Sequence, residues 1–528
     1  MGFATSDLDS TLSPTASAKL GRRAVWFLLL AMLTSLAVGY RLQHRSNSRI
    51  WNADEGISYV VSTCHSNEYR DDVTGTLSDQ WLPAPRWKRL VQPGPQFCFR
   101  QIATDLSESD VHPPLYFWAL HVWTHFFGND LSAGFGLNCA FVVLELLALA
   151  GLSRSAGLDA WVAAGGVALF SLNGVSANSG LEMRPYALLG FVSVAHVVAA
   201  FRMWRSPRER SWREMLGLAL SVLAGILTSY LFVYELLTTA LAGLAVTGLR
   251  DRRRLLQALS ATVVALGVAW ALFPFGQQLV LHHAGQVQFA GFGARMLTAL
   301  KTVGLVAPHP LGFVATTVAF LFVGAGFVVV DVWRHGVRGL QDRGTTLVVG
   351  ITLILTSALI FQYCVGLSPV HAMGPKYMAA VWPMLCLSCV AMVNALPHGR
   401  ILVVVVVLAG TAPQLPASWI GLGQAPLRLR HRSDSVVVLD STNRLHLPRV
   451  LPLLPDTAQV LVADYRTLLT RADLVPTAKS FWYWTCTPTA ATSRGSRDVL
   501  HAWATSYTPG RPSPLAKSWK AVHLVRTR

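Results

Sequence analysis

Long apolar stretches alternate with short polar connections along most of this chain. Eleven of these stretches approach the roughly 20 residues that an α-helix needs to cross a bilayer. They lie near residues 24–40, 131–152, 157–175, 184–203, 215–230, 231–249, 255–275, 311–333, 345–363, 376–395 and 400–420. The pattern predicts an α-helical polytopic membrane protein with about eleven transmembrane helices.

The basic residues between the stretches predict how the chain is threaded. They gather in short blocks around 19–23, 202–213, 250–254 and 334–343. If the segment 24–40 is an uncleaved first span and the tail 1–23 is cytoplasmic, every block falls on the cytoplasmic side, as the positive-inside rule requires. The same threading places four regions outside: 41–130, the turn at 173–184, the loop 277–310 and the turn at 366–376. We expect a bacterial inner (plasma) membrane protein, with 277–310 acting as a lid.

The C-terminal segment 421–528 also falls outside and has a different composition. Short β-branched runs at 436–439 and 460–462 alternate with stretches rich in Leu and Arg. This alternation predicts a small extracytoplasmic α/β domain. The aromatic run 481–484 favours a buried strand within it, although such a run also suits sugar stacking or a membrane surface.

Composition agrees with the membrane assignment. The chain is 52% hydrophobic and only 13% charged, with a mean hydropathy of +0.42, whereas soluble domains carry about 25% charged residues. The net charge of +17 is explained by the cytoplasmic blocks, so we predict no nucleic-acid partner. Seven cysteines are too few for a disulfide framework, but Cys64 and Cys98 share an outer region and leave one disulfide open.

Ionisable and aromatic residues recur at the outer ends of the predicted spans. Each group alone has a simple structural explanation as a helix cap, a rigid turn or an interfacial anchor. Their shared location indicates a site, since carboxylates suit a base or a cation and Arg or Lys suits a phosphate. The groups are Asp54-Glu55, Asp110-x-His112-Pro-Pro-Leu-Tyr116, Glu182-x-Arg184-Pro-Tyr186, and His371 with Lys376-Tyr377.

These motifs, in this order, resemble the C-type (GT-C) superfamily of membrane glycosyltransferases. The branch they are most similar to holds protein O-mannosyltransferases, the aminoarabinose transferase and rhizobial galacturonic acid transferases. The resemblance covers most of residues 24–395 and does not extend to the C-terminal segment. His-Pro-Pro-Leu-Tyr in a polytopic frame is its most specific part, and Lys376 stands where the family pattern has arginine.

The resemblance implies a transmembrane glycosyltransferase domain over 24–420 that uses a polyprenyl-phosphate sugar donor. Asp54 would be the catalytic base, with Glu55 beside it, and the transfer would invert the anomeric configuration. The substrate-binding residues would be Asp110, His112, Tyr116, Glu182, Arg184, Tyr186, His371, Lys376 and Tyr377. The partners would be the lipid-linked sugar, the bilayer and an unidentified acceptor, which could be a glycan, a lipid or a protein. A divalent cation is the one cofactor we consider, with Asp54, Glu182 and His112 as candidate ligands.

Two other functions compete with this interpretation. A transporter or flippase of a lipid-linked saccharide predicts ionisable residues buried in the spans and discontinuous helices at the midplane. Glu145 and Glu235, which lie within apolar stretches, are its support. A catalytically silent scaffold that displays the C-terminal domain predicts that Asp54→Asn has no effect.

Overall fold

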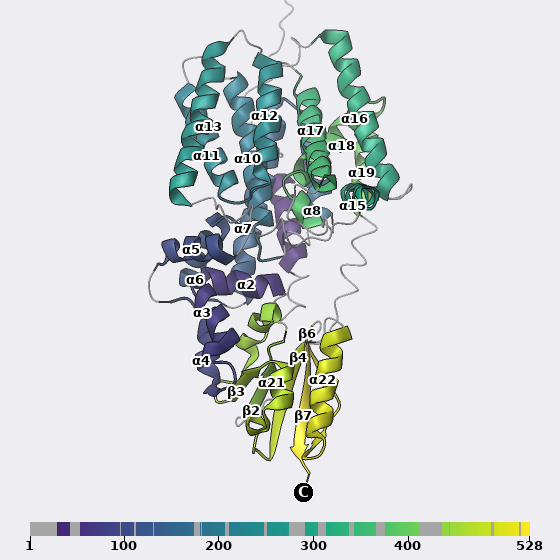
Figure 1. Cartoon of the computed structure of the whole chain (residues 1–528). Helices are drawn as coiled ribbons and strands as arrows, with labels where there is room; N and C mark the ends of the chain where they lie inside the picture. Colours follow the sequence, from purple (N-terminus) through teal and green to yellow (C-terminus); the bar gives the residue numbers. More distant parts are fainter. Residues whose placement is uncertain are drawn as a thin grey trace, which may run out of the picture.

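The computed structural model has a helical bundle at one end and a mixed β-sheet at the other (Figure 1). A layer of short helices lies between them. The structure describes residues 29–42, 53–94, 97–109, 112–129, 131–173, 180, 182–205, 211–247, 251–273, 291–304, 313–336, 343–365, 375–411, 436–442, 444–486, 490–516 and 519–527.

Each of the eleven predicted spans overlaps an apolar helix, so the prediction of a polytopic helical membrane protein is confirmed. Five helices are long and apolar enough to cross a bilayer: α7 (Leu131–Ser155), α10 (Tyr186–Arg205), α13 (Arg252–Leu272), α16 (Phe313–His335) and α17 (Gly344–Cys364). The others are shorter: Leu29–Leu42, α8 (Ala160–Leu172), α11 (Ser211–Ile226), α12 (Phe232–Thr247), α18 (Trp382–Asn394) and α19 (Gly399–Thr411).

The long helices are almost equally apolar but differ greatly in burial. In the most apolar window of α10 and α17, 72% and 67% of residues are buried inside the protein, against 17% in α13 and in α16. The outer helices expose large apolar side chains, such as Phe322 at 75% and Trp333 at 82%. Soluble proteins rarely expose apolar patches of this size, so α13 and α16 present the surface that lipid covers.

The region between the first span and α7 is folded rather than an open loop. It contains α2 (Ala53–Ser62), α3 (Ser66–Asp71), η1 (Asp72–Thr76), β1 (Trp81–Pro83), α4 (Ala84–Lys88), η2 (Arg89–Val91), α5 (Phe99–Ser109) and α6 (Leu115–Phe127). A disulfide joins Cys64 to Cys98. We call residues 53–127 the outer segment, after the outer location that the sequence predicts for it.

The C-terminal segment forms the predicted α/β fold. Its strands are β2 (Val436–Asp440), β3 (Gln459–Ala463), β4 (Ser480–Cys486), β5 (Tyr507–Pro509), β6 (Ser513–Ala516) and β7 (Trp519–Arg526). The sheet order is β1-β3-β2-β4-β7-β5, with β6 on β7. The strands β3, β2 and β4 are parallel, and β7 is antiparallel to β4. The aromatic run lies in β4 with Phe481, Tyr483 and Trp484 buried, so its assignment as a buried strand is confirmed.

The two faces of the sheet pack on different parts of the chain. Helices α21 (Tyr465–Thr470) and α22 (Ala490–Trp503) contribute Leu468, Val499 and Trp503 to the core on one face. The other face packs on the outer segment, where Tyr59 and Trp87 share a buried cluster with residues of β2, β3 and β4. The outer segment also supplies β1, which pairs antiparallel with β3. The outer segment and the C-terminal segment therefore share one core.

One predicted loop contains a helix. Residues Phe292–Gly304, inside the loop expected over 277–310, form α15, which packs on α16 and α17 and buries Ala299 and Val303. This part of the predicted loop is therefore a packed helix, because residues after Gly291 form a helix whose apolar face meets the bundle.

Candidate functional site

The first turn of α2 carries Asp54 and Glu55. Acidic residues are favourable there because the helix dipole places partial positive charge at the N-terminus. Asp54 lies inside the helix rather than before it, so it is not the N-cap that its sequence context also allowed. Glu55 is fully buried and its Oε1 accepts a hydrogen bond from the backbone N–H of Met183 at 3.3 Å. The helix thus directs one carboxylate inward and leaves Asp54 partly exposed.

Asp54 forms an ion pair with Lys376, from the short helix η5 (Pro375–Met378). Lys376 Nζ lies 2.8 Å from Asp54 Oδ2. The same ammonium group lies 5.6 Å from the ring centre of Tyr186 and 5.7 Å from that of Tyr377. These are cation–π distances, so the two predicted tyrosines hold the lysine beside the carboxylate.

Neighbouring charges set the pKa values of this pair. Partial burial raises the pKa of Asp54, but Arg184, Lys376 and His112 lower it, and the net pKa lies below its ordinary value. Burial lowers the pKa of Lys376, whereas Tyr186, Asp54 and Glu182 raise it, and the net pKa is raised. Both groups therefore remain charged through the neutral range, as a cation-stabilised carboxylate should.

Arg184 is the second cation of the site and is almost fully buried. Its Nη1 donates to Ser58 Oγ at 3.4 Å, one turn along α2 from Asp54. Its Nη2 lies 3.4 Å from His112 Nε2. The sequence motifs around His112 and Arg184, which lie in different parts of the chain, therefore meet at the Asp54 end of α2.

Glu182 also belongs to this site, and a hydrogen bond to its carbonyl holds its backbone in position. The Asn138 side-chain amide donates to the Glu182 carbonyl, and Tyr116 donates its hydroxyl to Asn138 Oδ1 at 3.0 Å. Tyr116 is fully buried, so in this structure it supports Glu182 rather than facing the site. Burial raises the pKa of Glu182, with Asp54 and Glu55 adding to the rise and Lys376 opposing it. Asn138 was not anticipated, since an amide inside an apolar stretch carries no motif.

The C-terminal segment contributes two further residues that the motifs did not indicate. Its short helix η6 (Arg444–Arg449) packs on α2, and a Cβ added at Gly56 would lie only 2.9 Å from Pro448 Cβ. Arg449 Nη1 lies 3.3 Å from His446 Nδ1. Asp54 acts electrostatically on His446, and Glu55 acts on Arg449. The one sequence signal was Gly56 directly after the two carboxylates, since a glycine admits close backbone approach.

Two predicted site residues, Asp110 and His371, lie outside the described residues. The remainder come from four separate regions of the chain: Asp54 and Glu55, His112 and Tyr116, Glu182 to Tyr186, and Lys376 with Tyr377. We call Asp54, Glu55, Glu182, Arg184, His112 and Lys376 the rim site, because they gather where the bundle meets the outer segment.

The rim site does not fit a metal ion in this arrangement. Among the residues that the structure describes, one trio of His, Cys or carboxylate residues has its ligand atoms within 4.8 Å of one another, namely Cys64, Cys98 and His121. The two cysteines form the disulfide, so they are not the thiolates that bind metals. Asp54, Glu182 and His112 form no such group there, and Lys376 already neutralises Asp54. We therefore derive no step through a metal.

No protein-family model and no curated protein matches the chain. Similar solved structures include the oligosaccharyltransferase of Archaeoglobus fulgidus tethered to an acceptor peptide, with a TM-score of 0.49 at 12% identity over 97% of this chain and 75% of that one. Another is ArnT of Cupriavidus metallidurans bound to undecaprenyl phosphate, with a TM-score of 0.38 at 12% identity over 96% of this chain and 98% of that one.

Proposed function

We propose that this protein is an inverting glycosyltransferase that moves a sugar from a polyprenyl-phosphate donor to an acceptor at the outer face of the membrane. The observation that carries the proposal is the convergence of one partly exposed carboxylate, Asp54, with two cations, Lys376 and Arg184, from distant parts of the chain. The reaction needs a base for the acceptor and positive charge for a departing phosphate. The rim site has both.

The location supports a lipid-borne donor. The rim site lies where the apolar bundle meets the folded outer segment (Figure 1). A polyprenyl chain can stay among the apolar helices while its phosphate and sugar reach this polar region. The far end of the bundle carries the basic residues, such as Arg205, which donates to the Ser155 carbonyl at 2.7 Å. The positive-inside rule favours a cytoplasmic location for that end, which supports our proposal that the rim site lies outside.

The proposed reaction begins with an exchange of partners. A donor phosphate that binds Lys376 and Arg184 competes with Asp54 for Lys376 and releases the carboxylate. Asp54 then accepts the proton of an acceptor hydroxyl or amine while that group attacks the anomeric carbon. The bond between the anomeric carbon and the phosphate oxygen breaks with its electron pair on the phosphate. Attack from the face opposite the phosphate inverts the configuration.

The remaining residues of the rim site shape this exchange. Glu55 fixes the backbone of Met183, next to Arg184, and so positions the guanidinium. Glu182, with its raised pKa, and His112 are suited to orient the acceptor. His446 and Arg449 bring groups of the C-terminal segment within electrostatic range of Asp54 and Glu55, so that segment takes part in forming the site.

The direct test is transfer by purified protein in the presence of candidate acceptors. We would incubate it with a panel of radiolabelled polyprenyl-phosphate sugars and compare wild type with Asp54→Asn. We expect one donor to be consumed by wild type only, with an inverted product linkage. If no donor is consumed across a broad panel, or if Asp54→Asn consumes it equally well, the proposal is wrong.

The transporter alternative finds less support in the structure. Glu145 lies in the middle of α7, which is continuous from Leu131 to Ser155, and Glu235 lies in the continuous helix α12. Transporters of this kind place such residues at broken helices. Glu145 also interacts electrostatically with the buried Arg41. A flippase assay with fluorescent lipid-linked saccharide in vesicles tests the alternative, and protein-dependent flipping that survives Asp54→Asn would favour it.

A further inference from the structure

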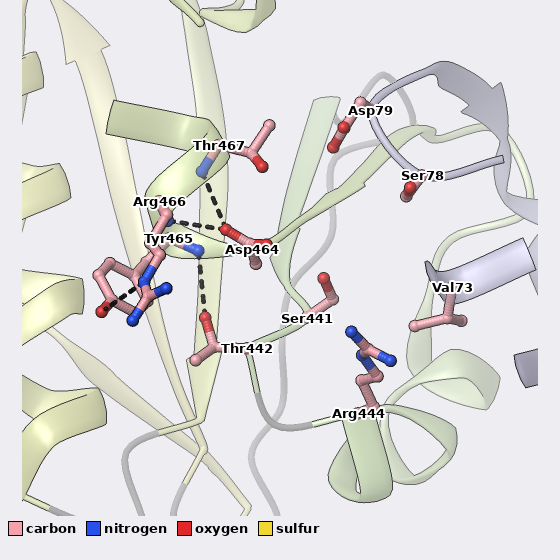
Figure 2. A pocket seen from close by; sticks show the side chains of 10 residues that line it. All are labelled: Val73, Ser78, Asp79, Ser441, Thr442, Arg444, Asp464, Tyr465, Arg466 and Thr467. Carbon is pink, nitrogen blue, oxygen red and sulfur yellow. Dashed lines mark hydrogen bonds between the residues drawn. The ribbon is translucent and has the colours of Figure 1, made fainter. Parts of the chain in front are cut away.

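A second polar site lies at one end of η6, and the rim site lies at the other end of that helix. It is a pocket of about 360 Å³ between the outer segment and the sheet (Figure 2). The outer segment contributes Ser78 and Asp79, the residues after β2 contribute Ser441, Thr442 and Arg444, and the residues after β3 contribute 464–467. Small-molecule sites occupy roughly 300–1,000 Å³, so the pocket has room for a sugar ring.

The pocket lies outside the carboxyl ends of two parallel strands of the sheet. The strands β2 and β3 are parallel neighbours, so their carboxyl ends meet at one edge. Ligands of such sheets bind in the crevice outside these ends. Asp79 closes the crevice from the outer segment, and its backbone N–H donates to the Val462 carbonyl of β3 at 2.9 Å.

Internal hydrogen bonds hold the lining in place. Asp464 Oδ1 accepts from the backbone N–H groups of Arg466 and Thr467 at 2.8 and 2.9 Å. Thr442 Oγ1 accepts from the backbone N–H of Tyr465 at 3.1 Å, which joins the two strand ends (Figure 2). Arg466 Nε donates to the Tyr465 hydroxyl at 3.3 Å. The Tyr465 ring in turn rests on Gly495 of α22, where an added Cβ would lie 2.7 Å from it.

The charges of the lining balance. The lining contains two carboxylates, Asp79 and Asp464, and two arginines, Arg444 and Arg466, together with serine and threonine hydroxyls (Figure 2). A phosphate would leave Asp79 and Asp464 opposed to like charge, and a cation would meet the two arginines. A neutral ligand with many hydroxyls satisfies both kinds of group, because each hydroxyl donates to a carboxylate and accepts from a guanidinium.

We propose that this pocket binds a neutral, polyhydroxylated sugar ring that belongs to the acceptor. Arg444 begins η6, and the other end of that short helix packs on α2 beside Asp54 and Glu55. Six residues of 3₁₀-helix span about 12 Å, so a saccharide of a few rings reaches from the pocket to the rim site. The identification of this sugar as acceptor rests on the proposed function, whereas the binding itself does not.

The test is direct binding to the full chain in lipid nanodiscs. Saturation-transfer difference NMR would measure methyl glycosides of glucose, mannose and galactose, with methyl glucuronoside and inorganic phosphate as charged probes. We expect at least one neutral glycoside to bind in the millimolar range and Arg444→Ala to weaken it at least tenfold. The control is Arg497→Ala, an exposed arginine of α22 that lies outside the pocket lining, which should bind as wild type does.

Three results would overturn the proposal: no neutral glycoside binds, a charged probe binds more tightly, or Arg444→Ala binds normally. Arg444→Ala retains the backbone carbonyl that accepts a hydrogen bond from Tyr69, so the variant should fold, and a thermal unfolding curve checks this. Asp54→Asn should bind the glycoside as wild type does. Binding without any transfer activity would therefore refute only the proposed function.

Discussion

Two pairs of opposite charge lie at different depths in this chain. Arg41 and Glu145 are buried in the bundle, and Arg41 donates to the carbonyls of Ala37 and Ser171 at 3.1 Å each. Asp54 and Lys376 lie at the rim, 2.8 Å apart, with 45% and 27% of their side chains exposed. The first pair is locked by its surroundings, whereas the second faces a region that substrates can reach.

This difference in burial distinguishes a pair that stabilises the fold from a pair in which a ligand can replace one partner. Removing a buried hydrogen-bond donor costs about 1–3 kcal/mol, because its partners are left unsatisfied away from water. A partly exposed ion pair contributes only about 0–1 kcal/mol. A phosphate can therefore replace Asp54 at Lys376 at small cost, whereas Arg41 is held by its buried hydrogen bonds to the Ala37 and Ser171 carbonyls.

The largest expected effect is on catalysis at the rim. Asp54→Asn should lower the transfer rate by about 10²–10⁴-fold, the usual contribution of a general base, and leave the unfolding temperature unchanged. Single-turnover assays with the donor identified above measure it. Asp71→Asn is the matched control, because Asp71 is an exposed carboxylate of the same outer segment. Equal losses in both variants would remove Asp54 from the mechanism.

The buried pair should affect folding instead of catalysis. We expect Arg41→Met to lower the free energy of unfolding by about 1–3 kcal/mol, because the buried Ala37 and Ser171 carbonyls lose their donor. Denaturation in mixed micelles gives the stability, and activity per folded molecule should stay at the wild-type level. A specific loss of activity in a stable Arg41→Met protein would contradict a purely structural pair.

A smaller effect should distinguish the role of Lys376 from that of Asp54. Lys376→Met should reduce turnover by about 10²-fold, since it removes one donor to a developing anion. Lys376→Arg should recover part of the rate by restoring the charge. Tyr377→Phe keeps the ring that packs on the ammonium and serves as the control. An unchanged rate in Lys376→Met would show that Arg184 alone holds the phosphate.

The pH profile should depend on Glu182 more than on Asp54. The pKa of Asp54 is lowered, so as pH falls Asp54 stays ionised below its ordinary titration range. The pKa of Glu182 is raised above its ordinary 4.5, so Glu182 takes up a proton first. We expect activity to fall on the acid side at a pH above 4.5, and Glu182→Gln to move that limb to lower pH. If the acid limb of the pH profile stays at the same pH in Glu182→Gln, the limb reports the titration of another group.

The smallest expected effect is that of a chelator. Lys376 and Arg184 already provide positive charge beside the carboxylates, so EDTA treatment followed by dialysis should leave the transfer rate unchanged. Restoration of a lost rate by Mg²⁺ or Mn²⁺ would instead assign Asp54 and Glu182 to a cation, as the sequence allowed.

The sequence predicted the features that depend on local patterns. Apolar stretches predict the transmembrane helices directly. The positions of Asp54, Arg184 and Lys376 next to the ends of predicted spans predicted that these residues lie at one face of the membrane. Contacts between residues that are distant in the sequence had no such signal. Nothing in the pattern indicated that β1 joins the sheet, that Asn138 supports Glu182, or that His446 and Arg449 reach α2. These contacts arise from packing between regions distant in sequence, which no periodicity encodes: 44 positions separate Asn138 from Glu182, and hundreds separate β1 from β3 and η6 from α2.

The strand β1 has a consequence for how the protein is made. It pairs with β3, and nearby Lys88 forms an ion pair with Asp456, 368 residues later in the chain. During synthesis the outer segment emerges long before its partner, so its final core cannot assemble until every span has been inserted. The Cys64–Cys98 disulfide joins two residues of the outer segment, so it can form before the C-terminal segment is synthesised. The shared core of this protein therefore completes only after β3 has been synthesised, and a chain that stops before residue 459 keeps its inserted spans without that core.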